Sequence, residues 1–112
     1  MSLNNAFTKD PEAVLDYAFN WADWLDTSTT PNESIIAHTV TVPTGLTLDS
    51  SMVSDFVIAA EVPEDEVTIP NSLVIAWISG GTVGTTYRVE CLITTSAGRK
   101  DERSLWITVQ ER

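Results

Sequence analysis

Residues 73–109 constrain the fold of this chain more than any other stretch, because their side chains follow the two-residue period of β-strands. The clearest segment is 87–93, whose odd-numbered side chains are Tyr87, Val89, Cys91 and Ile93. The segments 73–78 and 105–109 are equally apolar, and glycine-containing polar turns separate the three. This pattern is typical of strands rather than helices. We therefore predict three neighbouring strands whose odd-numbered side chains build a shared interior.

Two earlier stretches carry a similar signal. Residues 14–25 fit both a strand and a helical stripe, and their aromatic content favours a strand that ends in one helical turn at 22–26. Residues 34–42 form another predicted strand, and its core-facing side chains would be those of Ile36, His38, Val40 and Val42.

The middle of the chain completes the set. A short strand or a bend is expected at 46–51 and a weakly alternating strand at 55–62. Breaks are expected at 63–66 and at 70–72, where proline is followed by small or acidic residues. About seven short strands with turn signals about every ten residues indicate an all-β sandwich of the immunoglobulin or fibronectin-type-III kind.

The domain organisation follows from this pattern. We predict a loosely held N-terminal arm at residues 1–13, with turn chemistry at the step from Asp10 to Pro11, and the sandwich at 14–112. The first three residues, Met-Ser-Leu, fit a cloning remnant as well as a native start.

Charge and composition exclude several classes of function. The 112 residues carry 16 acids against six bases, a net charge of −10, whereas nucleic-acid binding needs Lys and Arg for phosphate contacts. No apolar run approaches the roughly 20 residues that cross a bilayer, and no signal peptide is recognisable. One cysteine allows no internal disulfide, which fits synthesis in a reducing cytoplasm.

The residues that usually carry catalysis or bind metals are sparse. His38 and Cys91 are the only residues of their types, so a zinc site lacks ligands, and Cys91 is expected to pack in the core. The acids at 61–66 match no calcium-loop spacing, and they are expected to be solvated. We therefore predict no catalytic residues, no cofactor and no metal.

Two features of the last third have structural or binding meaning. Gly84 followed by Tyr87 at a strand start is similar to a tyrosine corner, in which the phenol hydroxyl bonds back to the backbone. Trp77, Leu92 and Trp106 are out of phase with the interior, and a turn centred on Arg99 would set the last two opposite each other. Exposed apolar side chains of this size often mark contact surfaces. The alternative is that residues 61–71 or the N-terminal arm cover them.

Several longer motifs resemble one family. The stretches are 7–17, 20–25, 42–46, 76–87 and 93–104, and the most specific motifs are Trp-x-Ser-Gly-Gly and Ala-Gly-Arg-x-Asp-x-Arg-Ser. They are similar to small virion proteins of tailed phages and prophages, the fibre–tail adaptors, which have an immunoglobulin-like domain. The chain departs from that pattern at 61–71, which is longer and more acidic.

The resemblance implies a non-enzymatic structural adaptor in the tail, neck or fibre attachment of a virion. It would be made in the bacterial cytoplasm, and its partners would be other virion proteins, with a homo-oligomeric ring among the assemblies. In that setting Arg99 and Arg103 are candidate partner contacts, since each can bind a carboxylate in a bidentate way; otherwise they lie on a solvated hairpin tip. The alternative function is an immunoglobulin-like module that binds a carbohydrate or another surface ligand.

Overall fold

A computed structural model describes residues 6–28 and 32–111 of the chain. They form seven strands and one short 3-10 turn, which are β1 (Ala6–Lys9), β2 (Leu15–Asn20), β3 (Ile35–Thr41), β4 (Leu46–Ile58), η1 (Pro63–Asp65), β5 (Val67–Gly80), β6 (Thr86–Thr95) and β7 (Lys100–Val109). The predicted all-β class and the number of strands are confirmed. In the described parts of the chain, no helix is long and apolar enough to cross a bilayer.

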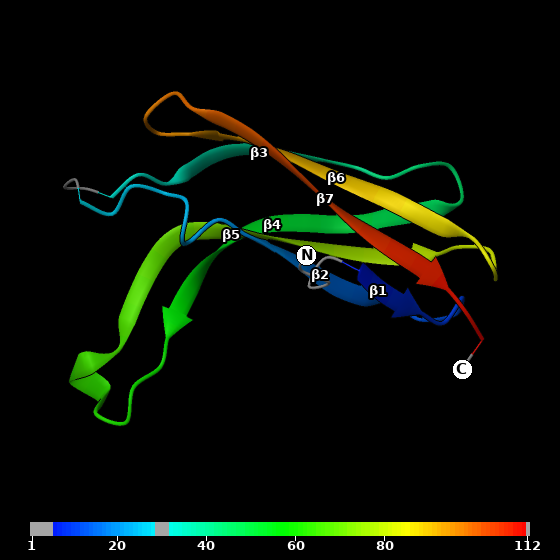
Figure 1. Cartoon of the computed structure of the whole chain (residues 1–112), viewed down its shortest axis with the longest axis horizontal. Helices are drawn as coiled ribbons and strands as arrows, with labels where there is room; N and C mark the ends of the chain where they lie inside the picture. The colour runs from blue at the N-terminus through cyan, green and yellow to red at the C-terminus, as the bar shows by residue number, and fades with distance from the viewer. Residues whose placement is uncertain (1–5, 29–31, 112) are drawn as a thin grey trace.

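The strands make two sheets that pack face to face (Figure 1). Sheet A has the order β1-β7-β6-β3, and sheet B has the order β2-β5-β4. All pairs are antiparallel except β1 with β7, which run in parallel. This arrangement, with the second, fourth and fifth strands in one sheet and the third, sixth and seventh in the other, is that of an immunoglobulin-like sandwich.

The core lies between the sheets, where the inward side chains of both meet. Its members include Val74, Ala76 and Ile78 of β5, Val89, Cys91 and Ile93 of β6, and Leu105, Ile107 and Val109 of β7. Each buried aliphatic side chain of this size stabilises the fold by roughly 1.5–3 kcal/mol. The interior positions expected in 87–93 and 105–109 are confirmed.

For the segment 73–78 of that block, the predicted neighbours and the expectation of inward odd-numbered side chains are both wrong, whereas the outward position expected for Trp77 is confirmed. β5 lies in sheet B between β2 and β4, so it faces β6 across the core and does not pair with it. Its even-numbered residues point inward, and the odd-numbered Leu73, Ile75 and Trp77 alternate with them on the outer face. The alternation defined a strand, but it carried no information about the strand's neighbours.

The segment at 14–25 folds as predicted. β2 is followed by a single turn, in which the N–H groups of Trp24 and Leu25 both donate to the carbonyl oxygen of Trp21. Tyr17, Phe19 and Trp21 are buried from this segment, since they share the inward face of the strand.

The predicted inward face of 34–42 is wrong at its first residue. Ile36 is 65% exposed, and its neighbour Ile35 is buried instead. A β-bulge between Ile35 and Ala37 shifts the pairing with β6 by one residue, which turns the side chains before it to the other face. His38, Val40 and Val42, beyond the bulge, are half-buried.

Two expected interruptions are absent. The short strand or bend expected at 46–51 and the first half of the strand expected at 55–62 belong to the single long strand β4, which ends at Ile58, and the break at 70–72 lies inside β5. There Asn71 has φ of 50°, and the register shifts opposite Ser54, so the break is a bulge. At the N-terminus, residues 6–9 of the expected arm form β1 in sheet A, while the first three residues lie outside the described part of the chain.

Candidate interaction surfaces

The outer face of sheet B carries a continuous apolar stripe, which we call the sheet-B stripe: Leu73, Ile75, Trp77 and Met52. The first three alternate along β5, and Met52 of β4 lies directly opposite Ile75. Side chains at i and i+2, and those directly opposite in an antiparallel pair, share one face at distances that allow contact. Trp77 is 40% exposed and Met52 is exposed as well, so no described segment covers them.

The stripe is bordered by short or polar side chains. Asp16 and Ser50 lie opposite Trp77 on the two neighbouring strands, and Ala18 lies opposite Ile75. An apolar centre with a polar rim is the usual composition of a protein contact surface.

The outer face of sheet A is different, because its exposed apolar side chains Leu92 and Trp106 are separate. Leu92 pairs with Glu102 and Trp106 pairs with Arg88, so the prediction that they lie opposite each other is wrong. The chain reverses earlier than expected, in a turn closed by the N–H of Thr95 and the carbonyl of Arg99 (2.8 Å). The two side chains are four residues apart along the sheet, roughly 13 Å.

Polar groups fill the space between them. Arg88 donates through Nε to the hydroxyl of Ser104 (3.1 Å), and its guanidinium lies 5.9 Å from the ring centre of Trp106. Single exposed apolar residues among polar neighbours are common on protein surfaces. The sheet-B stripe is therefore the stronger candidate surface, and Trp77 is the predicted contact residue that lies in it.

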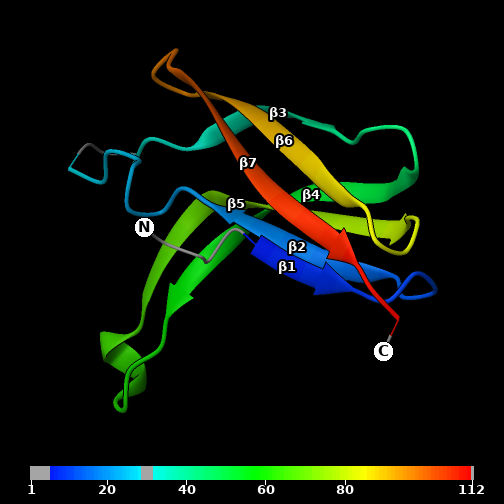
Figure 2. The same cartoon turned by 45° about the vertical axis from the view of Figure 1, so that its right-hand side comes forward.

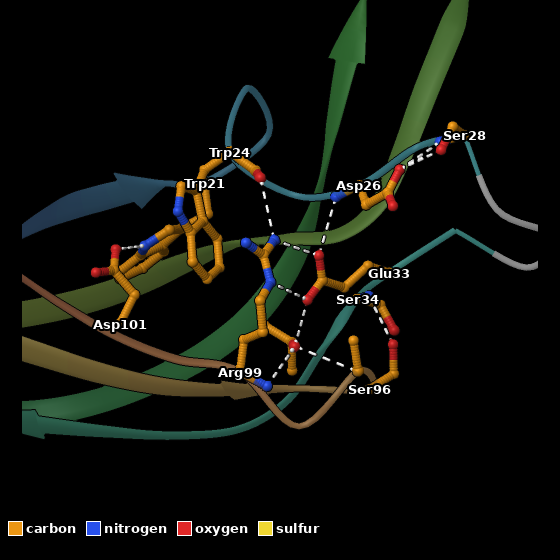
Figure 3. A network of polar contacts seen from close by, with 11 residues as sticks. Trp21, Trp24, Asp26, Ser28, Glu33, Ser34, Ser96, Arg99 and Asp101 are labelled. Carbon is orange, nitrogen blue, oxygen red and sulfur yellow. Dashed lines mark hydrogen bonds and ion pairs between the residues drawn. The ribbon is translucent and has the colours of Figure 1, made fainter.

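Arg99, predicted at a solvated tip or in a partner contact, is bonded within the chain (Figure 3). Its Nη2 and Nε bind the two carboxylate oxygens of Glu33 at 2.5 and 2.9 Å. Its guanidinium also lies 3.9 Å from the ring centre of Trp24. This contact joins the β6–β7 turn to the loop that follows β2.

Glu33 is almost fully buried, and its charge is retained by its partners. The bonds from Arg99, together with those from the Thr95 hydroxyl (2.5 Å) and the Asp26 N–H (3.0 Å), lower the pKa of Glu33 to about 2 against the opposing effect of burial. A buried carboxylate with three donors acts as a structural tie, since it offers no free oxygen to a ligand.

Arg103 is used in a second tie between the sheets. Its Nη1 donates to the carbonyl oxygen of Asn20 (2.5 Å), and its Nε lies 3.4 Å from the carboxylate of Asp101. The same carboxylate accepts a bond from the indole N–H of the buried Trp21 (2.8 Å). Both arginines thus hold the β6–β7 turn against the body of the domain.

Gly84 and Tyr87, singled out as a structural corner, lie where the chain crosses from β5 to β6. The Tyr87 hydroxyl accepts a bond from the N–H of Thr82 (2.9 Å), and the Gly84 N–H donates to the carbonyl oxygen of Val109 (2.8 Å). Gly45 and Gly81 pack against the Tyr87 ring so closely that a Cβ at Gly45 would lie 2.9 Å from it.

Cys91 and His38, the residues considered for catalysis or metal binding, are part of the fold. Cys91 is buried in the core as predicted, and burial raises the pKa of its thiol to about 12. The ring of His38 lies 3.0 Å from the hydroxyl of Ser51. Among the described residues, no group of His, Cys, Asp and Glu is placed to hold a metal ion.

The comparison with protein families bears on what these surfaces are for. Residues 9–108 match the family model described as Podophage GP4 fiber-tail adaptor protein gp77, which is most of the chain. The chain belongs to this fiber–tail adaptor family. A search of curated proteins found no match. Membership implies a structural, non-enzymatic role in a phage virion, as the resemblance predicted.

Some residues of this adaptor were missed by the sequence analysis. Ile75 and Met52 were not recognised as surface residues, although Ile75 has the same phase as Trp77 along β5. Lys9 was assigned to the arm, yet it is fully buried, and its Nζ donates to the carbonyl oxygens of Asp10 (2.8 Å) and Gly80 (2.7 Å). Burial lowers the pKa of Lys9.

Proposed function

We propose that this protein attaches fiber to tail in a podophage virion, and that it does so through protein contacts alone. The observation that carries the proposal is the sheet-B stripe on a chain of the fiber–tail adaptor family. A sheet face with an exposed tryptophan in an apolar stripe suits a partner surface, because aromatic side chains supply much of the binding free energy of protein interfaces.

The rigidity of the fold supports this role. The two ties at Arg99 and Arg103 fix the β6–β7 turn, and the stripe lies on β5, the central strand of sheet B. An adaptor must hold its two partners in a fixed orientation, and a surface on a rigid element loses less conformational entropy on binding than a loop does. Arg99 and Arg103 act in this proposal through the fold rather than as contacts.

The experiment compares two tryptophans of equal exposure on opposite faces. Trp77 and Trp106 are 40% and 38% exposed, on sheets B and A. Phage lacking the gene is complemented with the wild-type protein, Trp77→Ala or Trp106→Ala, and fiber protein per virion is measured by quantitative mass spectrometry. We expect Trp77→Ala to lower fiber content about tenfold or more, since a tryptophan buried in an interface contributes about 1.4 kcal/mol or more.

The controls distinguish a lost contact from a destabilised variant and from the absence of an adaptor function. Trp106→Ala should retain fibers, and both variants should unfold at the temperature of the wild type. Fiber loss with Trp106→Ala alone would move the contact to sheet A, and full fiber content without the gene would contradict the adaptor function. Light scattering of the purified protein tests the predicted homo-oligomeric ring, which would have a multiple of the 12.3 kDa subunit mass.

One observation favours the alternative function of carbohydrate binding. Trp77 lies directly opposite Asp16, so an exposed indole ring has a carboxylate beside it. An aromatic face with one polar neighbour can bind the apolar side of a sugar ring. Retention of the wild-type protein on a glycan array, lost with Trp77→Ala, would support this alternative; retention of both proteins would place sugar binding elsewhere.

A further inference from the structure

The hairpin formed by the end of β4 and the start of β5, residues 55–71, extends beyond both sheets; we call it the distal hairpin. Phe56, Val57 and Ile58 pair with Ile69, Thr68 and Val67, while β2 pairs with β5 only from Leu73 to Ile78. The distal hairpin is therefore a two-stranded ribbon without a third strand, and Figures 1 and 2 show it, in green, turning away from sheet A. A ribbon of two strands is marginally stable alone in water.

One face of the paired part of this ribbon is apolar. Phe56 lies opposite Ile69 and Ile58 lies opposite Val67, and the two pairs share a face because they are two residues apart. Ile58 is 47% exposed and Val67 is exposed to a similar extent, so nothing in the described chain covers this end of the face. The opposite face shows Val57 paired with Thr68.

The hairpin is held in a defined direction at its base. Ser72 is fully buried, and its hydroxyl donates to the carbonyl oxygen of Ile69 (2.7 Å) and accepts from the N–H of Phe56 (3.2 Å). The carboxylate of Asp55 accepts from the N–H of Asn71 (2.9 Å), whose φ of 50° makes the bulge. An element fixed in this way loses little conformational entropy when it binds.

The acidic charge at the tip of the distal hairpin indicates the charge of the partner surface. Glu61, Glu64, Asp65 and Glu66 lie within six residues there, and no lysine or arginine occurs between Lys9 and Arg88. All four are exposed. A surface that receives the apolar face must therefore be basic where it meets the tip, because like charges across an interface are unfavourable.

In a second copy of this chain, most basic side chains that the structure describes are already engaged and do not form such a surface. Four of its six basic residues are Lys9, Arg88, Arg99 and Arg103, and each is bonded within the chain. With a net charge of −10, a second copy is also an electrostatically unfavourable partner for the acidic tip. The partner that fits is a different protein.

We propose that the distal hairpin inserts into a basic, apolar groove of another virion protein and so forms a second contact, separate from the sheet-B stripe. This rests on the proposed function, since it requires the chain to be part of a virion. It gives the adaptor two surfaces, one on the body and one on an extension, which is what joining two different proteins requires.

The test uses adjacent residues of equal exposure on opposite faces of the ribbon. Val57 is 46% exposed, against 47% for Ile58. A photo-crosslinking amino acid is placed at position 57 or 58 of the full chain, virions are assembled and irradiated, and crosslinked peptides are identified by mass spectrometry. We expect position 58 to crosslink at least about tenfold more than position 57, to a lysine- or arginine-containing segment of a different virion protein.

Two sets of variants give the functional readout. Ile58→Ser combined with Val67→Ser, and separately Glu64→Lys combined with Asp65→Lys, should each lower the copies of this chain or of its partner per virion about tenfold, whereas Val57→Ser should not. Crosslinks from position 58 to a second copy of this chain, or equal crosslinking from 57 and 58, would overturn the proposal. Wild-type copy numbers per virion in both double variants would also overturn it. Absence of the wild-type chain from virions would instead contradict the proposed function.

Discussion

At the scale of single residues, the most consequential side chain is the buried carboxylate of Glu33. It is bound by Arg99 and the Thr95 hydroxyl, which both come from the distant β6–β7 turn, and by the Asp26 N–H of its own loop. No sequence signal marked it, because a glutamate in a polar loop is usually solvated. It is buried because the loop after β2 and the β6–β7 turn meet there, and Arg99 comes from that turn.

Glu33 makes stability depend on pH in a predictable direction. Its pKa is about 2 in the folded protein, below the ordinary 4.5, so its contribution is complete above pH 4.5 and is lost as the pH falls towards 2. We expect Glu33→Gln to lower the free energy of unfolding by about 2 kcal/mol at pH 7, from lost charge-assisted bonds. Urea unfolding from pH 7 to 2.5 should show this difference shrinking.

The control for this prediction is Glu102→Gln, which changes an exposed carboxylate on β7. It should leave the free energy of unfolding within about 0.5 kcal/mol of the wild type. A difference between wild type and Glu33→Gln that stays constant with pH would contradict the assignment.

Tyr87 supports a second prediction at the same scale. Tyr87→Phe keeps the ring that packs on Gly45 and Gly81 and removes the acceptor for the Thr82 N–H. We expect it to lower the free energy of unfolding by about 1 kcal/mol, the order of one hydrogen bond. Chemical denaturation measures this, and an unchanged midpoint and slope would show that the corner bond is not needed.

At the scale of elements, one bulge divides the β4–β5 hairpin into a part inside sheet B and a two-stranded extension. Before Ser54 the two strands belong to sheet B, and after the register shift they leave it as the distal hairpin. The sequence showed Pro70 and Asn71 as a break because both residues interrupt regular strands. In the structure, β5 continues through these two residues and changes direction at them.

The third prediction concerns the Ser72 hydroxyl, which holds the base of this hairpin. Ser72→Ala removes its bonds to Phe56 and Ile69, so local opening of the distal hairpin should cost less free energy. We expect hydrogen exchange at 56–58 and 67–69 to rise about fivefold, from a loss of about 1 kcal/mol, with no change at 73–78.

Its control is Ser50→Ala, an exposed serine of the same strand β4. Exchange in the distal hairpin should be the same in this variant as in the wild type. Equal exchange rates in Ser72→Ala and the wild type would mean that the backbone pairing alone fixes the hairpin.

At the scale of the whole molecule, polar contacts connect the two sheets at both ends. Arg103 of β7 does so near the β6–β7 turn, where Arg99 also binds the β2–β3 loop, and Lys9 does so at the other end, where it links the end of β1 to Gly80 of β5. Together with the core between them, they make the sandwich a rigid support for the sheet-B stripe and for the distal hairpin.

The fourth prediction tests the Lys9 link. Lys9→Met keeps the length of the side chain and leaves the carbonyl oxygens of Asp10 and Gly80 without their donor. We expect the free energy of unfolding to fall by about 2 kcal/mol, whereas Lys100→Met, at an exposed lysine, should change it by less than about 0.5 kcal/mol. Equal free energies of unfolding for the two variants would mean that the cost of burying the Lys9 ammonium group offsets the stabilisation from its hydrogen bonds.

The sequence by itself determined the strands β2, β3, β5, β6 and β7, the inward faces of β2, β6 and β7, and the core position of Cys91. These follow from a local period, which a strand imposes on its own residues. The family was also readable from short motifs, since the matched region spans residues 9–108. The exposed position of Trp77 followed from the same alternation.

Only the tertiary structure decided which strands are neighbours, where the bulges lie and which charges are bonded within the chain. The position of β5 opposite β6, the outward turn of Ile36, and the use of Arg99 and Lys9 as ties all depend on residues distant in sequence. A local pattern fixes a strand's period but not its partner. Both proposed contact surfaces depend on which strands are partners.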